Sequence, residues 1–533
     1  MGKAHLNQVI TSHLIEYQAE RFPDKEVLVF EQGDLGEKVF TYSDLHQKGN
    51  RLASYFEEKG IKEGDTIIVY MWNRPETVLS FIAASTIGAI AVPVDPRAKG
   101  DRLVYFIDHV KAKAVLLSSE TLDNFRQIKE KVPFVETVAV AYHEDFPADV
   151  DGNFDNLNQI LADSSLKPVP QRIFDVNKVA QIIFTSGTTG NPKGVVMRHQ
   201  RIGLYNLLRQ LAWKYKKDDI LYTGLSLSHA NAQAVTLFPA LYGGIKAVFS
   251  PKFTKSRIWD ICRKYGCTSF SLLGGMAAGI FGEPERENDK DNPVRVVISA
   301  GMPKAIWEAF EKRFNVKVHE WYGSAEGGFA HNPPGKGPIG SFGKPLPGIM
   351  QFKVVDENDN PLGPNEVGEL IIKNLRGETK VEYYNNPEAS KEKTKGGWLR
   401  TGDMVHYDEK GWFYFDFRKG SELRKAGDFV QPEYLEAVMS KHPDISEVCV
   451  FGIPAESGAP GESDIVAAVK PFEEKSVDVN SIFEFCRQNL EANFVPLYIW
   501  VVDEIPKTPS EKLLRRVLKD NFDKNGQNVY RKG

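Results

Sequence analysis

Short apolar runs alternate with amphipathic segments along most of this chain, from about residue 41 to residue 355. Clear examples of the apolar runs are residues 66–70, 114–117, 247–249 and 294–298. Parallel strands that are buried on both faces read as continuous apolar runs, and each needs a crossover helix before the next strand. The pattern therefore predicts an α/β fold that is built on largely parallel sheets.

The texture of the sequence changes twice towards its C-terminal end. Residues 352–355 and 368–373 flank a turn-rich segment at 356–361, which indicates a hairpin and a smaller β-rich subdomain. Near residues 415–427 the apolar pattern is interrupted again. A compact α+β domain is expected after this break, with helices at 433–441 and 479–492 and strands at 448–452, 465–470 and 498–502. We expect the charged tail after Lys519 to be frayed.

Composition excludes several classes of protein. A chain of 533 residues is too long for one core, so more than one domain is expected. The 67 basic and 71 acidic residues give a net charge of -4, which does not suggest a nucleic-acid or anionic-membrane partner. Four scattered cysteines, Cys262, Cys267, Cys449 and Cys486, form no metal-type pair. They fit buried thiols in a reducing cytoplasm.

The start of the chain carries acidic residues and lacks the apolar core of a signal peptide. The most apolar stretch, residues 78–94, is interrupted by serine, threonine, glycine and proline. It is short for a membrane span and indicates a buried helix that leads into a strand. We expect a cytoplasmic protein without a transmembrane segment.

A loop rich in glycine, serine and threonine lies between two apolar runs, residues 179–184 and 195–197. Its residues are Thr185, Ser186, Gly187, Thr188, Thr189, Gly190, Asn191, Pro192, Lys193 and Gly194. Small residues let backbone N–H groups approach an anion, and the lysine adds a point charge, so the loop indicates a polyphosphate cradle. Pro192 and Gly194 around the lysine exclude a Walker A loop, and the flanking runs favour strand–loop–strand. The alternative is a plain surface turn.

Further motifs follow the loop in a fixed order. They are Tyr322-Gly323-Ser324-Ala325-Glu326, Trp398-Leu399-Arg400-Thr401-Gly402-Asp403, a linker from Arg418 to Gly427, and Lys507-Thr508-Pro509-Ser510-Glu511-Lys512. With these motifs, nearly the whole chain resembles the superfamily of adenylate-forming enzymes. That superfamily includes AMP-forming acyl-CoA synthetases, luciferases and the adenylation domains of nonribosomal peptide synthetases.

The resemblance implies a division of the chain and a reaction. Residues 1–417 would form a large N-terminal region of two α/β subdomains plus a β-rich one. Residues 418–533 would form a small mobile α+β lid. The family reaction uses ATP, Mg²⁺ and CoA: a carboxylate attacks the α-phosphate of ATP to give acyl-AMP and pyrophosphate, and a thiol then displaces AMP. Because a carboxylate and a polyphosphate repel each other, the site must concentrate positive charge.

The resemblance also assigns residues to the nucleotide. Asp403 would accept hydrogen bonds from the ribose hydroxyls, although an acid after Thr-Gly could also cap a turn. Tyr322 would stack beside adenine, and Gly301 would let the nucleotide lie close to the backbone. Arg418 would add a further contact, with a solvated linker arginine as the alternative. Glu326 resembles the Mg²⁺ ligand, since Mg²⁺ needs few carboxylates besides phosphate oxygens.

Three residues are assigned to the chemistry. Lys193 would act on the phosphates, and Lys512 would reach from the lid to bridge carboxylate and α-phosphate; an exposed lysine is the alternative for the latter. His229 matches the gate between the nucleotide and acyl pockets, although a lone histidine is often structural. Gly427 would let the pantetheine arm of CoA approach.

The chain departs from the family pattern at several positions. Ala325 replaces a threonine whose hydroxyl would donate to phosphate, unless Ser324 or a water substitutes for it. Phe417 stands in place of an aspartate, Gly420 in place of the hinge residue, and Glu511 in place of a glycine. These changes motivate a second hypothesis, a non-catalytic nucleotide- or acyl-binding protein. The retained charged residues argue against it.

Only local resemblance limits the identity of the substrate acid. Residues 225–232 lack the acid that holds an amino-acid substrate, and no carrier-protein segment follows Lys512. Residues 252–260, 292–296 and 300–303 are most similar to crotonobetaine/carnitine–CoA ligases and to fatty-acid-transport-like relatives. The expected substrate is therefore a small carboxylic acid of carnitine type or a short-to-medium acyl acid. The alternatives are a long-chain fatty acid and, without support, a luciferase-like oxygenation. Candidate pocket residues are His229, residues 272–276, Met302 and Trp321. The face of the Trp321 ring suits a trimethylammonium group; the alternative is that Trp321 packs in the protein core.

Overall fold

The computed structural model describes residues 6–149, 152–185, 191–418, 423–426, 428–430, 432–459, 461–472, 477–506 and 515–532. The expected loop residues Ser186–Gly190 lie outside these ranges, as do Gly427 and Lys512. Within the described residues, no helix has the length and apolar character needed to cross a membrane.

The first sheet has the strand order β7-β6-β5-β3-β4-β8-β9. Its strands are β3 (Thr66–Tyr70), β4 (Ile90–Pro93), β5 (Ala114–Ser118), β6 (Thr137–Ala141), β7 (Asp155–Asn156), β8 (Val179–Thr185) and β9 (Lys193–Arg198). All neighbouring strands are parallel except β8 and β9, which form an antiparallel hairpin. The hairpin confirms the predicted strand–loop–strand.

Alternate residues of β3 supply the cores on the two faces of this sheet. Ile67 and Val69 pack with α3 (Tyr42–Glu58) and α4 (Pro75–Ile87), whereas Ile68 and Tyr70 pack with α5 (Gly100–His109) and α6 (Leu122–Arg126). Every residue of α4 and β4 is buried. The apolar stretch at residues 78–94 is thus a buried helix followed by a strand, as predicted. The helices α2 (Thr11–Arg21) and α7 (Leu157–Ala162) pack against α3.

The second sheet has the order β16-β15-β14-β13-β12-β10-β11-β1-β2. Its strands are β1 (Glu26–Glu31), β2 (Glu37–Thr41), β10 (Ile220–Thr223), β11 (Lys246–Phe249), β12 (Ser269–Leu273), β13 (Val296–Ala300), β14 (Lys317–Tyr322), β15 (Ala330–Asn332) and β16 (Lys344–Pro345). The central strands are parallel, and β2, β15 and β16 pair antiparallel at the two edges.

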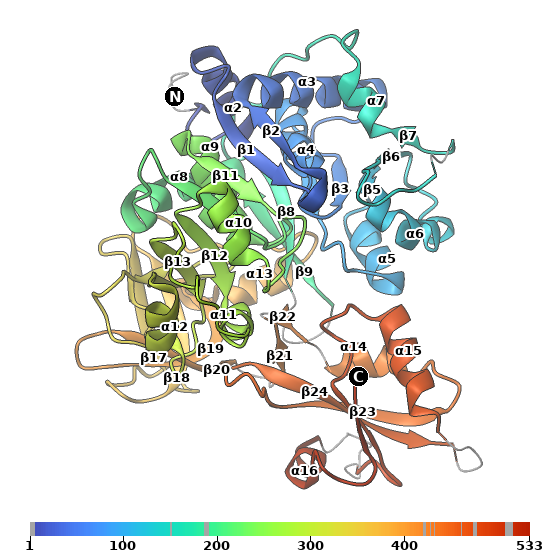
Figure 1. Cartoon of the computed structure of the whole chain (residues 1–533), viewed down its shortest axis with the longest axis vertical. Helices are drawn as coiled ribbons and strands as arrows, with labels where there is room; N and C mark the ends of the chain where they lie inside the picture. Colours follow the sequence, from blue (N-terminus) through green and yellow to red (C-terminus); the bar gives the residue numbers. More distant parts are fainter. Residues whose placement is uncertain are drawn as a thin grey trace.

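Helices cover both faces of the second sheet and join it to the first. The outer face packs with α10 (Ile258–Tyr265), α11 (Gly274–Phe281) and α12 (Trp307–Phe314). The inner face shares one core with the first sheet, to which α8 (His199–Leu208), the π-helical turns η4 (Arg209–Trp213) and η5 (Ala232–Leu237), and α9 (Phe238–Gly243) contribute. The two α/β layers therefore form one body (Figure 1).

The β-rich part is an antiparallel sheet in chain order, β17 (Met350–Val355), β18 (Gly368–Asn374), β19 (Leu399–Tyr407) and β20 (Phe413–Arg418), with α13 (Pro387–Lys393) beside it. The hairpin expected around residues 356–361 is the β17–β18 connection. Short 3₁₀ turns are η1 (Gly33–Leu35), η2 (Ser119–Thr121), η3 (Lys129–Lys131) and η6 (Lys395–Gly397).

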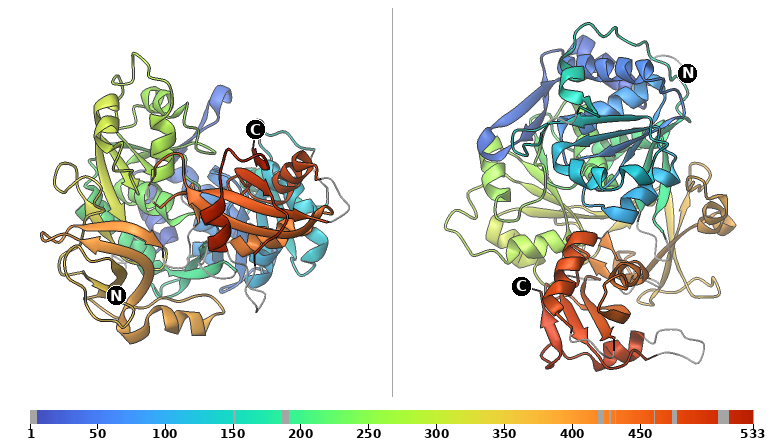
Figure 2. Two further views of the ribbon diagram at one scale, coloured as in Figure 1. Left: turned by 90° about the horizontal axis from the view of Figure 1, so that it is seen from below. Right: turned by 90° about the vertical axis from the view of Figure 1, so that its right-hand side faces the viewer.

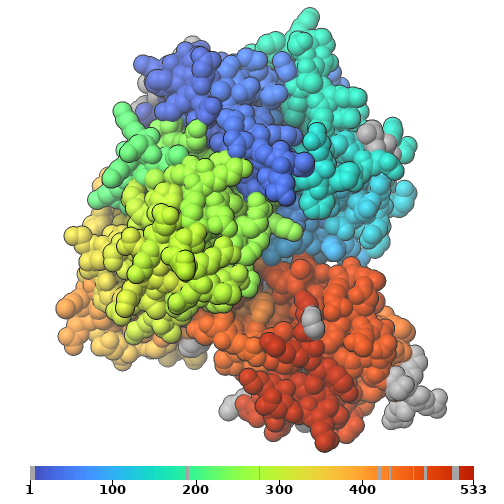
Figure 3. All heavy atoms as spheres, viewed as in Figure 1, coloured from blue at the N-terminus to red at the C-terminus, as the bar shows by residue number. Residues whose placement is uncertain are grey.

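The C-terminal part is an α+β unit that forms its own lobe below the rest in Figures 1 and 3. It contains β21 (Arg424–Lys425), β22 (Asp428–Phe429), β23 (Ile445–Pro454), β24 (Ser463–Pro471), β25 (Tyr498–Val501) and β26 (Val529–Arg531), with α14 (Pro432–Met439), α15 (Val479–Asn489) and α16 (Arg515–Asn521). Figure 2 shows this lobe set against both the α/β body and the β-rich part. The predicted fold class is confirmed; the boundary at residues 417–418 stays a prediction.

The prediction of a frayed tail is wrong. Strand β26 pairs antiparallel with β25, and α16 precedes it. Backbone hydrogen bonds and the partly buried Val529 hold the strand. An edge strand needs apolar residues on only one side, so the polar composition of residues 529–531 did not indicate a strand. The four cysteines are buried and free, as expected.

Candidate active site

The motif residues that the structure describes converge where the β8–β9 hairpin, the second sheet and the β-rich part meet. Thr185 is the last residue of β8 and pairs with Lys193, the first residue of β9. Gly301 directly follows β13, and Tyr322 ends β14. Since β13 and β14 are parallel, their carboxyl ends lie at one edge of the sheet, which is where ligands bind in such folds.

Glu326 links the phosphate-loop side of the site to the β-rich part. Its Oε1 accepts hydrogen bonds from Thr185 Oγ1 at 3.3 Å and from the Tyr383 hydroxyl at 3.1 Å. Lys193 Nζ lies 5.3 Å from the centre of the Tyr383 ring, on its face. Tyr383, which sequence reasoning missed, thus touches both predicted residues. An open pocket lined by Thr185, Lys193, Glu326 and Tyr383 extends from here.

The chemistry of this donor set suits Mg²⁺. A carboxylate beside a hydroxyl offers hard oxygens, and Mg²⁺ commonly takes one or two carboxylates and completes its shell with phosphate oxygens and water. Among the described residues there is no cluster of three or more acidic, histidine or cysteine side chains that would form an all-protein cage. Glu326 and Thr185 would therefore hold the ion together with a bound polyphosphate.

A second pocket contains the residues expected to hold the nucleoside. Ala300, Gly301, Met302, Tyr322, Phe342 and Asp403 line it. The Tyr322 hydroxyl donates to Asp403 Oδ2 at 2.5 Å, and the Tyr322 ring stacks on Phe342 with centroids 4.7 Å apart. Asp403 is buried, and its backbone N–H donates to Thr401 Oγ1 at 3.0 Å. Tyr322 and Asp403 are thus brought together in one pocket with an aromatic wall.

Gly301 adopts a left-handed backbone with φ +90° and passes very close to Gly274. A Cβ on Gly274 would lie 1.9 Å from the Gly301 carbonyl oxygen. Below this crossing, the Glu320 carboxylate accepts hydrogen bonds from the backbone N–H groups of Gly301 and of Met302, the latter at 3.1 Å. Glu320 therefore fixes the loop that forms the pocket floor.

Burial raises the pKa of Glu320 to about 8, although the two backbone hydrogen bonds oppose the shift. Sequence reasoning missed this residue because one acid within a strand looks like an ordinary solvent-facing position.

The Ser324 hydroxyl lies in the turn that follows the motif. Its Oγ donates to the Gly327 carbonyl at 3.0 Å and accepts from the Gly327 N–H at 3.3 Å, so it closes the turn after the motif. The Arg201 guanidinium, from the first turn of α8, instead donates to the Ala325 carbonyl. The pKa of Arg201 is lowered, because burial outweighs the opposing charges of Tyr205 and Glu326. A cation that sequence reasoning missed thus stands behind the Glu326 loop.

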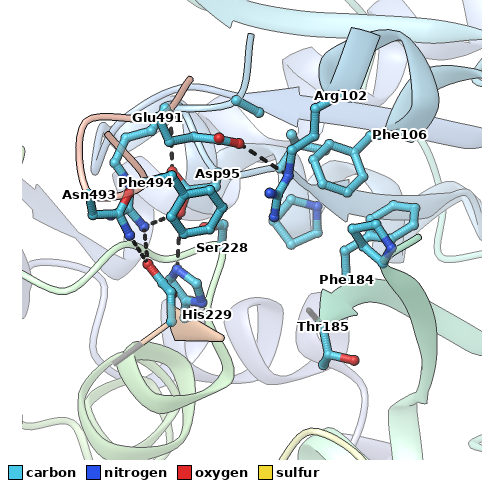
Figure 4. A pocket seen from close by; sticks show the side chains of 16 residues that line it. Asp95, Arg102, Phe106, Phe184, Thr185, Ser228, His229, Glu491, Asn493 and Phe494 are labelled. Atoms are coloured by element: carbon cyan, nitrogen blue, oxygen red, sulfur yellow. Dashed lines mark hydrogen bonds and ion pairs between the residues drawn. The ribbon is translucent and has the colours of Figure 1, made fainter. Parts of the chain in front are cut away.

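His229 lies at the junction with the C-terminal lobe (Figure 4). Its Nε2 is 3.1 Å from Asp95 Oδ2, and Arg97 contacts both Asp95 and, at 3.1 Å, Asp428 of β22. Burial lowers the pKa of His229, but the hydrogen bond to Asp95 and the charges of Asp428 and Asp95 outweigh it, so the pKa is raised. The Asn493 amide donates to Asp428 at 2.6 Å.

The remaining predicted residues are placed only in part. Arg418 ends β20 and is paired in register with Asp403, and its side chain is not described. Trp321 packs in the core against Trp213 and Phe329 and also lines the nucleoside pocket beside Met302.

Known proteins resemble this chain along most of its length. The family model described as AMP-binding enzyme matches residues 15–376, and that of the AMP-binding enzyme C-terminal domain matches residues 434–512. The crotonobetaine/carnitine–CoA ligase of Salmonella typhimurium is 29% identical over 509 residues, covering 93% of this chain and 96% of that protein. The Salmonella typhi enzyme is 29% identical over 512 residues, covering 94% and 97%.

Solved structures show the same fold. The o-succinylbenzoate CoA synthetase of Bacillus subtilis, bound with a product analogue, has a TM-score of 0.78 at 21% identity over 96% of this chain and 98% of that one. The amide bond synthetase of Marinactinospora thermotolerans has a TM-score of 0.79 at 21% identity over 98% and 100%.

Proposed function

Since the chain belongs to the family of AMP-binding enzymes and is an AMP-forming acid–thiol ligase, we propose that it activates a small carboxylic acid with ATP and transfers the acyl group to CoA. The proposed acid is of the crotonobetaine or carnitine type, or a short-to-medium acyl acid. The observation that carries the proposal is the convergence of Lys193, Glu326, Tyr322 and Asp403, from three separate parts of the chain, on adjoining pockets.

In the proposed first step, a carboxylate oxygen of the acid attacks the α-phosphorus of ATP, and the bond from that phosphorus to the pyrophosphate oxygen breaks. Both partners are anions, so the barrier falls when positive charge is held between them. Lys193 supplies one fixed charge, and Mg²⁺ held at Glu326 and Thr185 would neutralise the departing pyrophosphate. Asp403 and Tyr322 would hold the ribose and adenine, so that the α-phosphate stays beside β9.

In the proposed second step, the sulfur of CoA attacks the acyl carbon and gives up its thiol proton to solvent, and AMP leaves with the electrons of the acyl–phosphate bond. The thiol adds to one face of the planar acyl carbonyl, so it needs an open path to that face. The β21–β22 hairpin of the C-terminal lobe lies on the His229 side, where Asp428 meets Arg97. This placement supports the proposal that residues 418–533 form a lid; the role of Gly427, which lies outside the described residues, rests on the resemblance alone.

Trp321 supports a small acid over a long chain. Its ring lies 5.6 Å from that of Trp213 and 6.0 Å from that of Phe329, centre to centre, and Trp321 lines a pocket together with Met302. An aromatic wall limits the length of the acyl group and offers a face to a trimethylammonium group. Long-chain fatty acids remain the competing substrate class. A cytoplasmic location belongs to the same proposal, and the four buried free thiols support it.

The test is pyrophosphate release from ATP across a panel that contains crotonobetaine, carnitine, butyrate, octanoate and palmitate, with and without CoA. We expect release with the short or cationic acids and acyl-CoA formation only when CoA is present. Preference for palmitate would overturn the substrate class, and absence of release with every acid would favour a non-catalytic binding protein.

Lys512→Ala separates the two steps. We expect the variant to lose acyl-AMP formation and to retain most of its thioester formation from supplied acyl-AMP. Equal loss of both steps would remove the bridging role from Lys512.

A further inference from the structure

The outward side of α8 and η4 carries a row of exposed leucines. Leu204, Leu207 and Leu211 are 50%, 37% and 42% exposed. They follow each other at spacings of three and four residues, which places them on one face of the helix. Tyr205 and Trp213 point to the opposite side, where they are buried in the core. Three partly exposed leucines on one side of a helix give a strip of apolar surface that a partner could cover.

Lysines stand at the C-terminal end of this row. Lys214, Lys216 and Lys217 are exposed, and none of them forms an ion pair with another described residue. Lys214 adopts φ +50°, so the helix ends there and the lysines leave its axis. Asp218 is the exposed acid of this segment. The surface is locally basic although the chain as a whole has a net charge of -4.

We propose that this α8–η4 face binds peripherally to a membrane surface that carries anionic lipids. Leucine side chains that insert at the headgroup boundary are removed from water, and the lysines beside them bind lipid phosphates. An anionic membrane therefore suits both the apolar and the basic part of this face.

A second copy of the chain fits this face less well. A parallel copy would set the lysines against each other, and an antiparallel copy would set them against the positive N-terminal end of α8. In Figure 1, α8 lies at the left edge of the molecule, away from the C-terminal lobe, so membrane contact would leave that lobe free.

The inner side of the same segment is bonded to η5. Trp213 Nε1 donates to the Ala234 carbonyl at 3.4 Å, and the Tyr215 hydroxyl donates to the Val235 carbonyl at 3.0 Å. Because η5 follows the segment that carries His229, these two hydrogen bonds connect the α8–η4 segment to that part of the chain. The proposal goes beyond the proposed reaction and does not depend on it.

The experiment is sedimentation of the full chain with vesicles of phosphatidylcholine alone or mixed with phosphatidylglycerol. We expect binding to the anionic vesicles that weakens with added salt, because salt screens the lysine–phosphate attraction. L204S/L207S/L211S should bind at least about tenfold more weakly. K214E/K216E/K217E should bind on the order of 100-fold more weakly, from about 1 kcal/mol per lysine. Pyrophosphate release with a water-soluble acid should stay unchanged in both.

Matched controls are K264E/K290E/K312E, three exposed lysines on other elements, and L35S/V367S/L375S, three exposed apolar residues elsewhere. Both should bind like the unmodified chain. The proposal is overturned by absence of binding to anionic vesicles, or by control variants that lose binding equally. It is also overturned by a dimer in analytical ultracentrifugation that L204S/L207S/L211S converts to monomer, because the leucines would then join two copies.

Discussion

At the scale of single residues, Glu320 is a buried acid that holds the turn after β13 through two backbone hydrogen bonds. Its carboxylate is buried under the nucleoside pocket, yet both oxygens accept backbone N–H groups. Burial raises its pKa from 4.5 to about 8, so the folded protein holds a proton that the unfolded chain releases near pH 4.5. The folded state therefore binds more protons in this range, and stability falls as pH rises through it.

Glu320→Gln removes this titration, which gives a test. We expect the free energy of unfolding of the unmodified protein to decline relative to that of Glu320→Gln as pH rises from 4.5 to about 8. The decline should be about 1.4 kcal/mol for each unit between the folded and unfolded pKa values. Urea unfolding across this range measures it. A constant difference between the two proteins would show that the carboxyl does not titrate there; the loss of one acceptor in glutamine adds only a pH-independent offset.

Arg201 is a positioning residue, since it contacts the Ala325 carbonyl and not a reacting atom. Arg201→Met should leave the fold intact and raise the Mg²⁺ concentration needed for half-maximal pyrophosphate release by about tenfold or more, as is usual when support for a metal ligand is removed. Arg201→Lys should recover part of the loss because the charge returns. Arg198→Met, which removes an arginine paired with Glu382 at the start of the same segment, is the control. Equal effects of the two methionine variants would contradict the role.

At the scale of elements, the crossing of α11 with the turn after β13 sets the shape of the nucleoside pocket. Gly274→Ala would place a Cβ 1.9 Å from the Gly301 oxygen, so the turn has to move. We expect at least about tenfold weaker AMP binding by calorimetry, since the turn lines the pocket that is proposed to hold the nucleoside. Gly279→Ala, in the same helix with its nearest contact at 3.7 Å, should bind AMP normally and be about 0.5–1 kcal/mol more stable. Weak binding by both variants would point to the helix as a whole.

The elements also show what the sequence could predict. Strands such as β3 and β5 are buried on both faces, and therefore appear as apolar runs that any reader of the sequence finds. The β8–β9 hairpin was predictable for the same reason. Strand β26 was not, because its place depends on backbone pairing with β25, which composition does not encode.

The residues of the candidate site also fall into those that the sequence could predict and those that it could not. Lys193, Glu326, Tyr322 and Asp403 lie in recognisable motifs, and the structure brings them together; their roles stay predictions. Glu320, Tyr383 and Arg201 have local sequences that resemble ordinary strand, loop and helix positions. Their importance arises from contacts with residues that are 18 or more positions away in the chain, such as Met302 for Glu320 and Ala325 for Arg201. Such contacts exist only once the sheets have assembled.

At the scale of the whole molecule, the C-terminal lobe is held by a charged contact to the first α/β sheet. Arg97 bridges Asp95 and Asp428, and Arg102 pairs with Glu491 at 3.1 Å while its guanidinium lies over the Phe494 ring. These contacts hold the β21–β22 hairpin on the side of the pocket that His229 lines, so they stabilise the observed orientation of the lobe.

Asp428→Asn weakens that contact by removing one charge from the bridge. If this orientation serves thioester formation, the variant should form acyl-CoA from supplied acyl-AMP several-fold to tenfold more slowly, since truncating one partner of a partly buried pair costs about 1 kcal/mol or more. Acyl-AMP formation, measured as pyrophosphate release, should be unchanged or faster, because the lobe is freed for the first step. Asp523→Asn, an exposed acid of the same lobe, controls for the change in charge. Slower pyrophosphate release with normal thioester formation would assign this orientation to the first step instead, and the Arg97 bridge would then hold the lobe for adenylation.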